Sequence, residues 1–193
     1  MRKRAFTWLE MAVVLFFLMV VAAIMLPVIN RPREGNRTSC QSNLKSIALA
    51  VHNYMQDSDR RFPPVNAGRV GWSQLLHPYL KESRRFQCPT ESKPEQTGTT
   101  DYFYNARLSG VEERKVDYPA NTIMNGDGAG NAPSNASLSQ FSQEWVMNQK
   151  SPAYRHLEAA NYAYADGHVK MLEPKKITND KASSSVNTLE AAS

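Results

Sequence analysis

A segment near the end of the chain carries side chains that could ligate a transition metal. His156, Asp166 and His168 lie close together in the sequence, and imidazole and carboxylate groups suit zinc and related metals. However, Asp166-Gly167 stands between two strand-like runs, and Asp-Gly is typical of a two-residue type I′ hairpin turn with positive φ at both positions. This turn accounts for Asp166 and His168 without a metal. We therefore expect a structural role for His156, such as a hydrogen bond to a nearby loop.

A second candidate site is the glycine-rich segment NGDGAGNAPSN, residues 125–135. Asn125, Asp127 and Asn131 could supply the oxygen ligands that Ca²⁺ prefers. The segment has a single carboxylate and lacks a terminal glutamate, so any calcium binding would be weak. A glycine-rich turn is the favoured interpretation, calcium is the minority alternative, and no other cofactor is expected.

The chain has two cysteines, Cys40 and Cys88. They allow one intramolecular disulfide, and closing a loop of roughly 49 residues would stabilise the fold by about 4 kcal/mol. Two unpaired thiols are the alternative. A zinc ribbon with four cysteine ligands is excluded, because the chain has only two cysteines. Cys88 with His77 or His156 could form a nucleophilic pair, but the sequence places no base beside it and contains no nucleophile elbow or phosphate-binding glycine loop. We therefore expect no enzymatic activity.

The N-terminal part of the chain contains a segment that can cross a membrane. Residues 11–29 carry no charge, and nineteen helical residues at about 1.5 Å each nearly match a bilayer core of about 30 Å. No small-residue cleavage motif follows the segment, so an ordinary secretory signal is disfavoured and a plain signal anchor is one interpretation. That interpretation leaves Glu10 unexplained, because a carboxylate next to hydrocarbon costs a few kcal/mol and implies a cationic partner.

The stretch RKRAFTWLEMAVVLFFLMVVAAIMLPVI resembles the class III leader of type IV pilins and pseudopilins. The resemblance implies cleavage between Ala5 and Phe6 by a prepilin peptidase that then methylates the new amine; Ala5 departs from the glycine usual before the cut. Glu10 becomes the fifth mature residue, and Pro27 occupies the position where many pilins have a helix-kinking proline. The resemblance further implies that Glu10 pairs with the Phe6 amine of a neighbouring subunit, as a buried carboxylate requires.

The C-terminal half resembles the H-x9-DG group of prepilin-like proteins. In RHLEAANYAYADGHVKML, His156 is followed by nine residues and then by Asp166-Gly167. The segments CQSNLKSIALAVHNY, RFPP, GWSQLLHPYL and FQCP resemble segments of the same group in the same order. The resemblance covers most of residues 4–172, loosely over 106–154, and implies that the three signature residues are structural.

The elements that must position these residues follow from periodicity. Residues 38–57 have an apolar stripe at helical spacing, with Thr38 or Ser39 as N-cap, and Pro32 and Gly35 break or kink the helix before it. Strands are predicted over residues 101–108 and 121–126. Aromatic side chains are expected in the core rather than on a binding surface; they are Trp72, Tyr79, Phe86, Tyr102, Phe103 and Tyr104.

These observations predict a pilin-like α+β fold, with a long N-terminal helix whose first half is transmembrane, packed on a small antiparallel β-sheet domain. The expected parts are a leader (1–5), a transmembrane and assembly helix (6–30), a helix that continues into the globular domain (31–57), an α+β domain (58–172) and a disordered tail (173–193).

The predicted function is that of a structural subunit of a type IV pilus or a type II secretion pseudopilus. Its expected partners are the prepilin peptidase, other pilin-like subunits, inner-membrane lipid and an inner-membrane assembly platform. The expected location is the bacterial inner membrane, crossed once, with the globular domain in the periplasm or outside the cell. The alternative is a monomeric anchored binding module. Nucleic acid is not expected, because the +5 charge falls to +2 without Arg2, Lys3 and Arg4.

Overall fold

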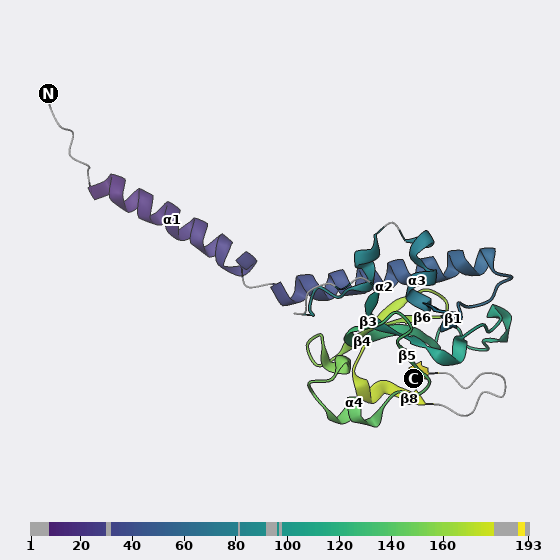
Figure 1. The fold of residues 1–193 in the computed structure, drawn as a ribbon. Helices are drawn as coiled ribbons and strands as arrows, with labels where there is room; N and C mark the ends of the chain where they lie inside the picture. Colours follow the sequence, from purple (N-terminus) through teal and green to yellow (C-terminus); the bar gives the residue numbers. More distant parts are fainter. Residues whose placement is uncertain are drawn as a thin grey trace. The chain divides into compact units, whose positions relative to one another are not determined.

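The computed structural model describes residues 8–29, 32–80, 82–91, 96, 98–179 and 189–191. The chain divides into two compact units, Met1–Gly35 and Asn36–Ser193, and each is described here by itself. Two long helices come first, α1 (Trp8–Ile29) and α2 (Pro32–Asp57). A sheet with short helices follows in the second unit (Figure 1). The chain therefore has the predicted α+β class, with a long apolar helix at its N-terminal end.

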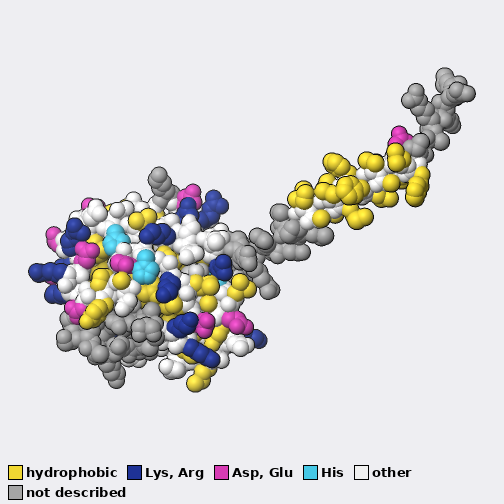
Figure 2. All heavy atoms as spheres, turned by 180° about the vertical axis from the view of Figure 1, so that it is seen from behind, with side chains coloured by type: hydrophobic (Ala, Val, Ile, Leu, Met, Phe, Trp, Pro, Cys, Tyr) yellow, Lys and Arg dark blue, Asp and Glu magenta, His cyan; other side chains and the backbone are white. Residues whose placement is uncertain are grey.

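Helix α1 exposes its apolar side chains on all sides. Phe16 and Phe17 are 67% and 69% exposed, and hydrophobic side chains cover the helix on the face drawn in Figure 2. In the described part of the chain, α1 is the one helix long and apolar enough to cross a membrane, over Trp8–Met25. A helix that is apolar all round is buried either in protein or in lipid, and no part of this span is buried within the chain.

Helix α2 begins before the N-cap expected at Thr38 or Ser39. It begins at Pro32, so Thr38 and Ser39 lie inside the helix and the N-cap prediction is wrong. Proline suits the first helical position because the amide it lacks has no partner there. Farther along, the predicted apolar stripe is confirmed, since one face of α2 is fully buried over Cys40, Leu44, Ile47 and Val51. Its partner in packing is the β-sheet (Figure 1).

The main sheet has five strands in the order β5-β3-β4-β6-β7. The strands are β3 (Thr99–Asn105), β4 (Ile123–Pro133), β5 (Ser137–Leu138), β6 (Ala160–Tyr164) and β7 (Val169–Leu172). All pairs are antiparallel except β3–β5, which is parallel. Two small two-stranded sheets join β1 (Asn66–Ala67) to β2 (Val70–Gly71) and β8 (Ile177–Asn179) to β9 (Leu189–Ala191).

Strand β4 replaces the glycine-rich turn predicted for residues 125–135. The glycines fit a strand here because neighbouring groups approach them closely: aromatic rings over Gly126, the backbone of β3 at Gly128 and the Glu91 side chain at Gly130. A Cβ on Gly126 would lie 2.5 Å from Tyr162 and 2.7 Å from Phe103. Since glycine in a strand often marks such a close approach, its frequency in this segment reflects packing rather than a turn.

Short helices connect the strands. They are α3 (Trp72–Leu75), η1 (His77–Tyr79), η2 (Ser83–Phe86), η3 (Ala106–Leu108), η4 (Glu113–Lys115), α4 (Gln143–Met147), η5 (Pro152–Tyr154) and η6 (Pro174–Lys176). The η elements are 3₁₀ turns, which natural proteins use in short pieces as connectors.

Hydrophobic clusters lie on both faces of the sheet. One joins α2 to Trp72, Tyr102 and Tyr104, and the other gathers Phe103 and Tyr162 with residues of later segments. Successive β3 side chains enter opposite clusters, as the two-residue period of a strand requires. Of the six aromatic residues expected in the core, five are buried, and Tyr79 is partly buried against the first cluster.

The tail predicted to be disordered, residues 173–193, has regular structure over residues 174–179 and 189–191, whereas residues 180–188 and 192–193 lie outside the described residues. Residues 174–176 form η6, and β8 pairs with β9. The prediction rested on polar composition, but Pro174 and Ile177 are buried. Two buried apolar side chains are enough to hold this short segment against the sheet, because each buried aliphatic side chain contributes on the order of 1.5–3 kcal/mol.

Candidate functional site

The predicted assembly residues belong to α1 or precede it. Glu10 lies in the first turn of α1, and its side chain is exposed. A carboxylate is favourable there because the helix dipole is positive at the N-terminus. Pro27 falls within the helical bounds of α1, whereas its side chain and the cleavage residues Ala5 and Phe6 lie outside the described residues.

A disulfide joins Cys40 to Cys88. Cys40 belongs to the buried face of α2, and Cys88 follows η2 in an extended segment. The bond spans 48 positions of the chain, with Cα atoms 5.2 Å apart. The structure thus resolves the choice between a disulfide and two unpaired thiols, and it removes Cys88 as a free nucleophile in this form of the protein.

His156 lies beside this disulfide, in a buried polar cluster. Its Nε2 is 3.7 Å from Cys88 Sγ and 3.3 Å from Asp127 Oδ2. Its Nδ1 is 3.4 Å from the hydroxyl of Thr90. The ring is therefore held between the disulfide, a carboxylate of β4 and the loop after Cys88. His77, the other histidine considered as a partner of Cys88, instead stacks on Phe86.

Arg155 completes the cluster, and sequence reasoning missed it. Its guanidinium is 3.5 Å from Asp127 Oδ1 and 3.2 Å from Glu91 Oε2, and only 7% of the side chain is exposed. It also donates hydrogen bonds to the carbonyl oxygens of Asp101 and Gly128. No signal in the surrounding segment SPAYRHLE distinguishes this arginine from a solvated one, because its partners lie far away in the sequence, in β3, β4 and the loop at Glu91.

Asp101 was also missed. Its Oδ2 accepts the backbone N–H of Cys88 at 2.7 Å, and its Oδ1 accepts the backbone N–H of Asn131 at 2.6 Å. Burial raises the pKa of the Asp101 carboxyl, although the two backbone hydrogen bonds act in the opposite direction. The side chain therefore fixes the backbone that carries Cys88.

Protein groups hold the oxygens of two of the three calcium candidates, Asn131 and Asp127. Asn131 Oδ1 accepts the Thr99 hydroxyl at 3.2 Å. Asn125 Oδ1 is buried with no hydrogen-bond partner among the described residues, and the Asn125 amide donates to the carbonyl oxygen of Phe103 at 3.4 Å.

Asp127 Oδ2 accepts the backbone N–H of Asn161 at 2.7 Å. Asp127 also faces the guanidinium of Arg155. A permanent cation beside the one carboxylate of this segment disfavours a calcium ion at that position.

The metal grouping of His156, Asp166 and His168 does not form. Among the described residues, the one group with metal-compatible spacing contains Cys40, Cys88 and His156. His168 instead stacks on Tyr164 with ring centres 4.1 Å apart, and its Nδ1 is 2.6 Å from Asp166 Oδ1.

The Asp-Gly hairpin forms between β6 and β7, but with a different turn. Tyr164 N–H donates to the carbonyl oxygen of His168, so three residues form the loop. Gly167 has φ +88°, whereas Asp166 is outside the left-handed region. The predicted two-residue type I′ turn is therefore wrong; a three-residue loop with glycine in the left-handed position takes its place.

A two-residue turn with positive φ at both positions occurs earlier, at Leu157 and Glu158. Their φ values are 51° and 66°, and His156 and Ala159 on either side exchange two backbone hydrogen bonds. Such a conformation is uncommon for leucine and glutamate. This turn reverses the chain directly after His156 and so sets the position of its ring.

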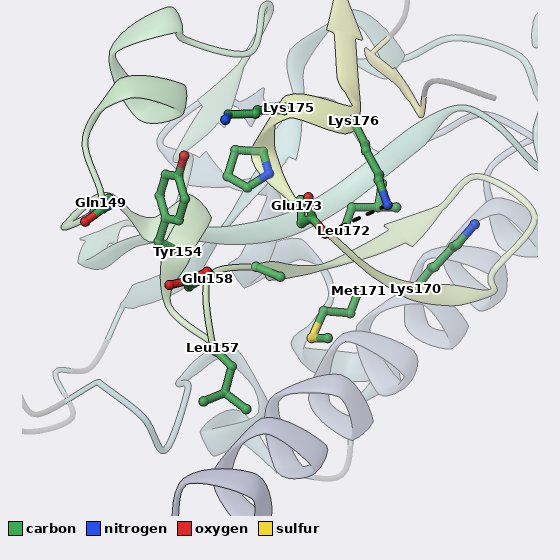
Figure 3. A pocket seen from close by; sticks show the side chains of 12 residues that line it. Gln149, Tyr154, Leu157, Glu158, Lys170, Met171, Leu172, Glu173, Lys175 and Lys176 are labelled. Atoms are coloured by element: carbon green, nitrogen blue, oxygen red, sulfur yellow. Dashed lines mark ion pairs between the residues drawn. The ribbon is translucent and has the colours of Figure 1, made fainter.

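A cavity of about 770 Å³ opens on the side of this turn. Leu157 and Met171 contribute apolar surface, and Lys170 and Lys175 contribute charge (Figure 3). Glu173 and Lys176 form an ion pair with a distance of 3.9 Å at its edge. None of the site residues predicted from the sequence lines this cavity.

Comparison with known proteins gives one partial match. Residues 31–87 match the family described as "Protein of unknown function (DUF1559)". No curated protein and no solved structure matches the chain. The matched part contains all of α2 and the segment up to the residue before Cys88. Together with the apolar N-terminal helix, this similarity is compatible with a pilin-like chain.

Proposed function

We propose that the protein is a structural prepilin-like subunit that assembles through α1 into a type IV pilus or a type II secretion pseudopilus. The observation that carries this proposal is the combination of an apolar helix exposed over Trp8–Met25, with Glu10 in its first turn, and an α+β unit that follows it in the chain. Before assembly the helix would lie in the lipid of the inner membrane. In the filament the same side chains would pack against helices of other subunits.

The proposed assembly step depends on the new N-terminus. A prepilin peptidase would cut between Ala5 and Phe6 and methylate the Phe6 amine. Each added subunit would then place this amine against Glu10 of a neighbour. If one subunit were shifted along the filament, Glu10 would lose the amine. In an apolar environment this would be unfavourable, because removing one partner of a buried ion pair costs about 3–5 kcal/mol. Glu10 would thus fix the axial register between subunits, and an inner-membrane platform would drive the addition. We propose no catalytic role.

The alternative is a monomeric membrane-anchored binding module. The cavity beside Leu157 and Met171 supports it, because a hollow with apolar and charged groups can hold a ligand. Crosslinking from cysteines introduced into α1 separates the two proposals in membranes. A ladder of self-crosslinked species supports assembly, whereas a single monomeric band supports the binding module.

The deciding experiment is mass spectrometry of the N-terminal peptide from protein extracted from membranes of a host with an active prepilin peptidase. Assembly by this pathway predicts a peptide that begins with N-methylated Phe6. A chain that retains residues 1–5 would refute the proposal and leave a simple membrane anchor. A host without the peptidase provides the control, in which the uncut peptide is expected.

A further inference from the structure

We propose that Cys40, Cys88 and His156 form a buried zinc site when the Cys40–Cys88 disulfide is reduced. The two sulfur atoms and a ring nitrogen of His156 lie within 4.8 Å of one another, and all three residues are buried. The inference is independent of the proposed assembly, because the cluster lies in the α+β unit and α1 contributes nothing to it.

The distance from His156 to Cys88 is close to that in a tetrahedral zinc site, whereas the two sulfur atoms, 2.03 Å apart in the disulfide, must separate on reduction. Zinc bonds are about 2.3 Å to thiolate and about 2.0–2.1 Å to imidazole nitrogen or carboxylate oxygen. At the tetrahedral angle these lengths place sulfur about 3.5 Å from nitrogen, and nitrogen about 3.3 Å from oxygen. In the protein, His156 Nε2 is 3.7 Å from Cys88 Sγ and 3.3 Å from Asp127 Oδ2. Asp127 is outside the group whose donor atoms all lie within 4.8 Å of one another, so it neighbours His156 and the fourth zinc position is left for water.

The orientation of His156 also fits a ligand. Its Nδ1 lies 3.4 Å from the hydroxyl of Thr90, and a metal-bound histidine commonly donates its second N–H to such a group. In this tautomer Nε2 directs its lone pair at Cys88 and Asp127. Nε2 and Asp127 Oδ2 are then both acceptors and repel each other. A proton or a cation between them would relieve this repulsion.

The charges of the zinc ion, the two thiolates and the nearby ionised side chains largely offset one another. Two thiolates and the Asp127 carboxylate supply three negative charges, and Zn²⁺ supplies two positive ones. Arg155, with its guanidinium 3.5 Å from Asp127 Oδ1, supplies the third positive charge. Glu91, whose carboxylate is 3.2 Å from the same guanidinium, adds one further negative charge, but its side chain is 22% exposed and solvent screens it. Thiolate and imidazole ligands together favour zinc over calcium or magnesium.

Reduction of the disulfide by a phosphine consumes one water molecule. A phosphine reductant and one water molecule react with the disulfide, the S–S bond breaks, and two thiols and a phosphine oxide form. The phosphine supplies the two electrons, and the water supplies the oxygen and both protons. Zn²⁺ then binds the two sulfurs as thiolates and releases the two thiol protons. Metal binding and disulfide formation therefore compete for the same sulfur atoms.

The test uses the full-length protein in detergent, reduced with a phosphine and freed of excess reductant without oxygen. Titration with Co²⁺ is expected to give one equivalent of bound metal, with the visible bands and the thiolate charge-transfer band of a tetrahedral site. Added Zn²⁺ is expected to remove these bands. The oxidised protein is expected to give none.

Substitutions at His156 and at its neighbour Asp127 test the site. His156→Gln and Asp127→Asn are each expected to weaken Co²⁺ binding at least about tenfold, whereas the control His168→Gln, which alters an exposed ring, leaves it unchanged. X-ray absorption of the zinc-loaded unmutated chain, which needs no variant to fold, is expected to report two sulfur and two nitrogen or oxygen ligands. The proposal is overturned by a reduced protein that gives no bands, by loss of the fold on reduction that metal does not restore, or by full binding in His156→Gln.

Discussion

The Nζ atom of Lys45 lies 2.7 Å from the carbonyl oxygen of Gly167. This hydrogen bond joins α2 to the loop between β6 and β7, across 122 positions of the chain. A Cβ on Gly167 would lie 3.0 Å from His52 Nε2, so a second α2 side chain packs against the same glycine. The Asp-Gly hairpin is therefore held against the helix that carries Cys40.

Lys45→Met is expected to destabilise the α+β unit by about 1 kcal/mol, because it removes one hydrogen bond from a charged donor at a position exposed to water. Chemical unfolding followed by near-UV circular dichroism measures this change. Lys175→Met, a substitution at an exposed lysine of the cavity rim, is the control and should have little effect. Equal stabilities of the two variants would mean that the Lys45 contact does not hold the hairpin.

The disulfide is expected to contribute about 4 kcal/mol of stability, through the entropy of the unfolded chain. Replacing Cys40 and Cys88 by serine should therefore lower the midpoint of chemical unfolding strongly. Reduction of the unmutated protein in the absence of metal ions should have a similar effect. A double variant as stable as the parent would contradict a stabilising role for the bond.

Arg155→Met is expected to cost about 3–5 kcal/mol, because it leaves the buried Asp127 carboxylate without its guanidinium partner. The matched control is Arg60→Met. Arg60 pairs with Glu113, but its side chain is 69% exposed, and an exposed ion pair contributes at most about 1 kcal/mol. Thermal unfolding of both variants tests the contrast. Similar small effects would show that Asp127 is adequately held by its other hydrogen bonds.

Stability is expected to fall as the pH rises above 10. Burial raises the pKa of Tyr164 to about 12, and it raises the pKa of Tyr104 and Tyr162 above the ordinary value of 10.0. Above pH 10 the unfolded chain loses these protons first, so it binds fewer protons than the folded chain and becomes more favourable. Absorbance at the tyrosinate wavelength should therefore rise together with unfolding. A full rise while the fold persists would refute this.

Glu10→Ala is expected to leave cleavage, folding and membrane insertion intact and to abolish assembly. The variant removes the carboxylate that the Phe6 amine of a neighbour would meet, and it costs nothing in the α+β unit. Filament or secretion-complex incorporation, measured in cells, is the readout, with N-terminal mass spectrometry as the check on cleavage. Glu82→Ala, at an exposed position of the α+β unit, is the control and should assemble. Normal incorporation of Glu10→Ala would refute the pairing.

The local features of the fold were predictable from sequence because they depend on nearby residues. The apolar run of α1, the buried stripe from Cys40 to Val51 in α2, and the hairpin at Asp166-Gly167 all follow from periodicity or a short motif. Details that depend on the exact backbone were wrong. Thr38 and Ser39 lie inside α2 and do not cap it, and Gly167 alone has positive φ in the hairpin loop.

The cluster around His156 was decided by tertiary structure alone. The sequence singled out His156, Cys88 and Asp127 for three separate reasons, and the fold brings them together through a strand, a loop and a turn. Arg155 carried no signal, because a buried and a solvated arginine have the same sequence neighbourhood. The sequence determines which faces are apolar and where the chain turns. The pairing of distant segments decides which polar groups share a buried environment. The strength of the hydrogen bonds and ion pairs between those groups depends on that environment.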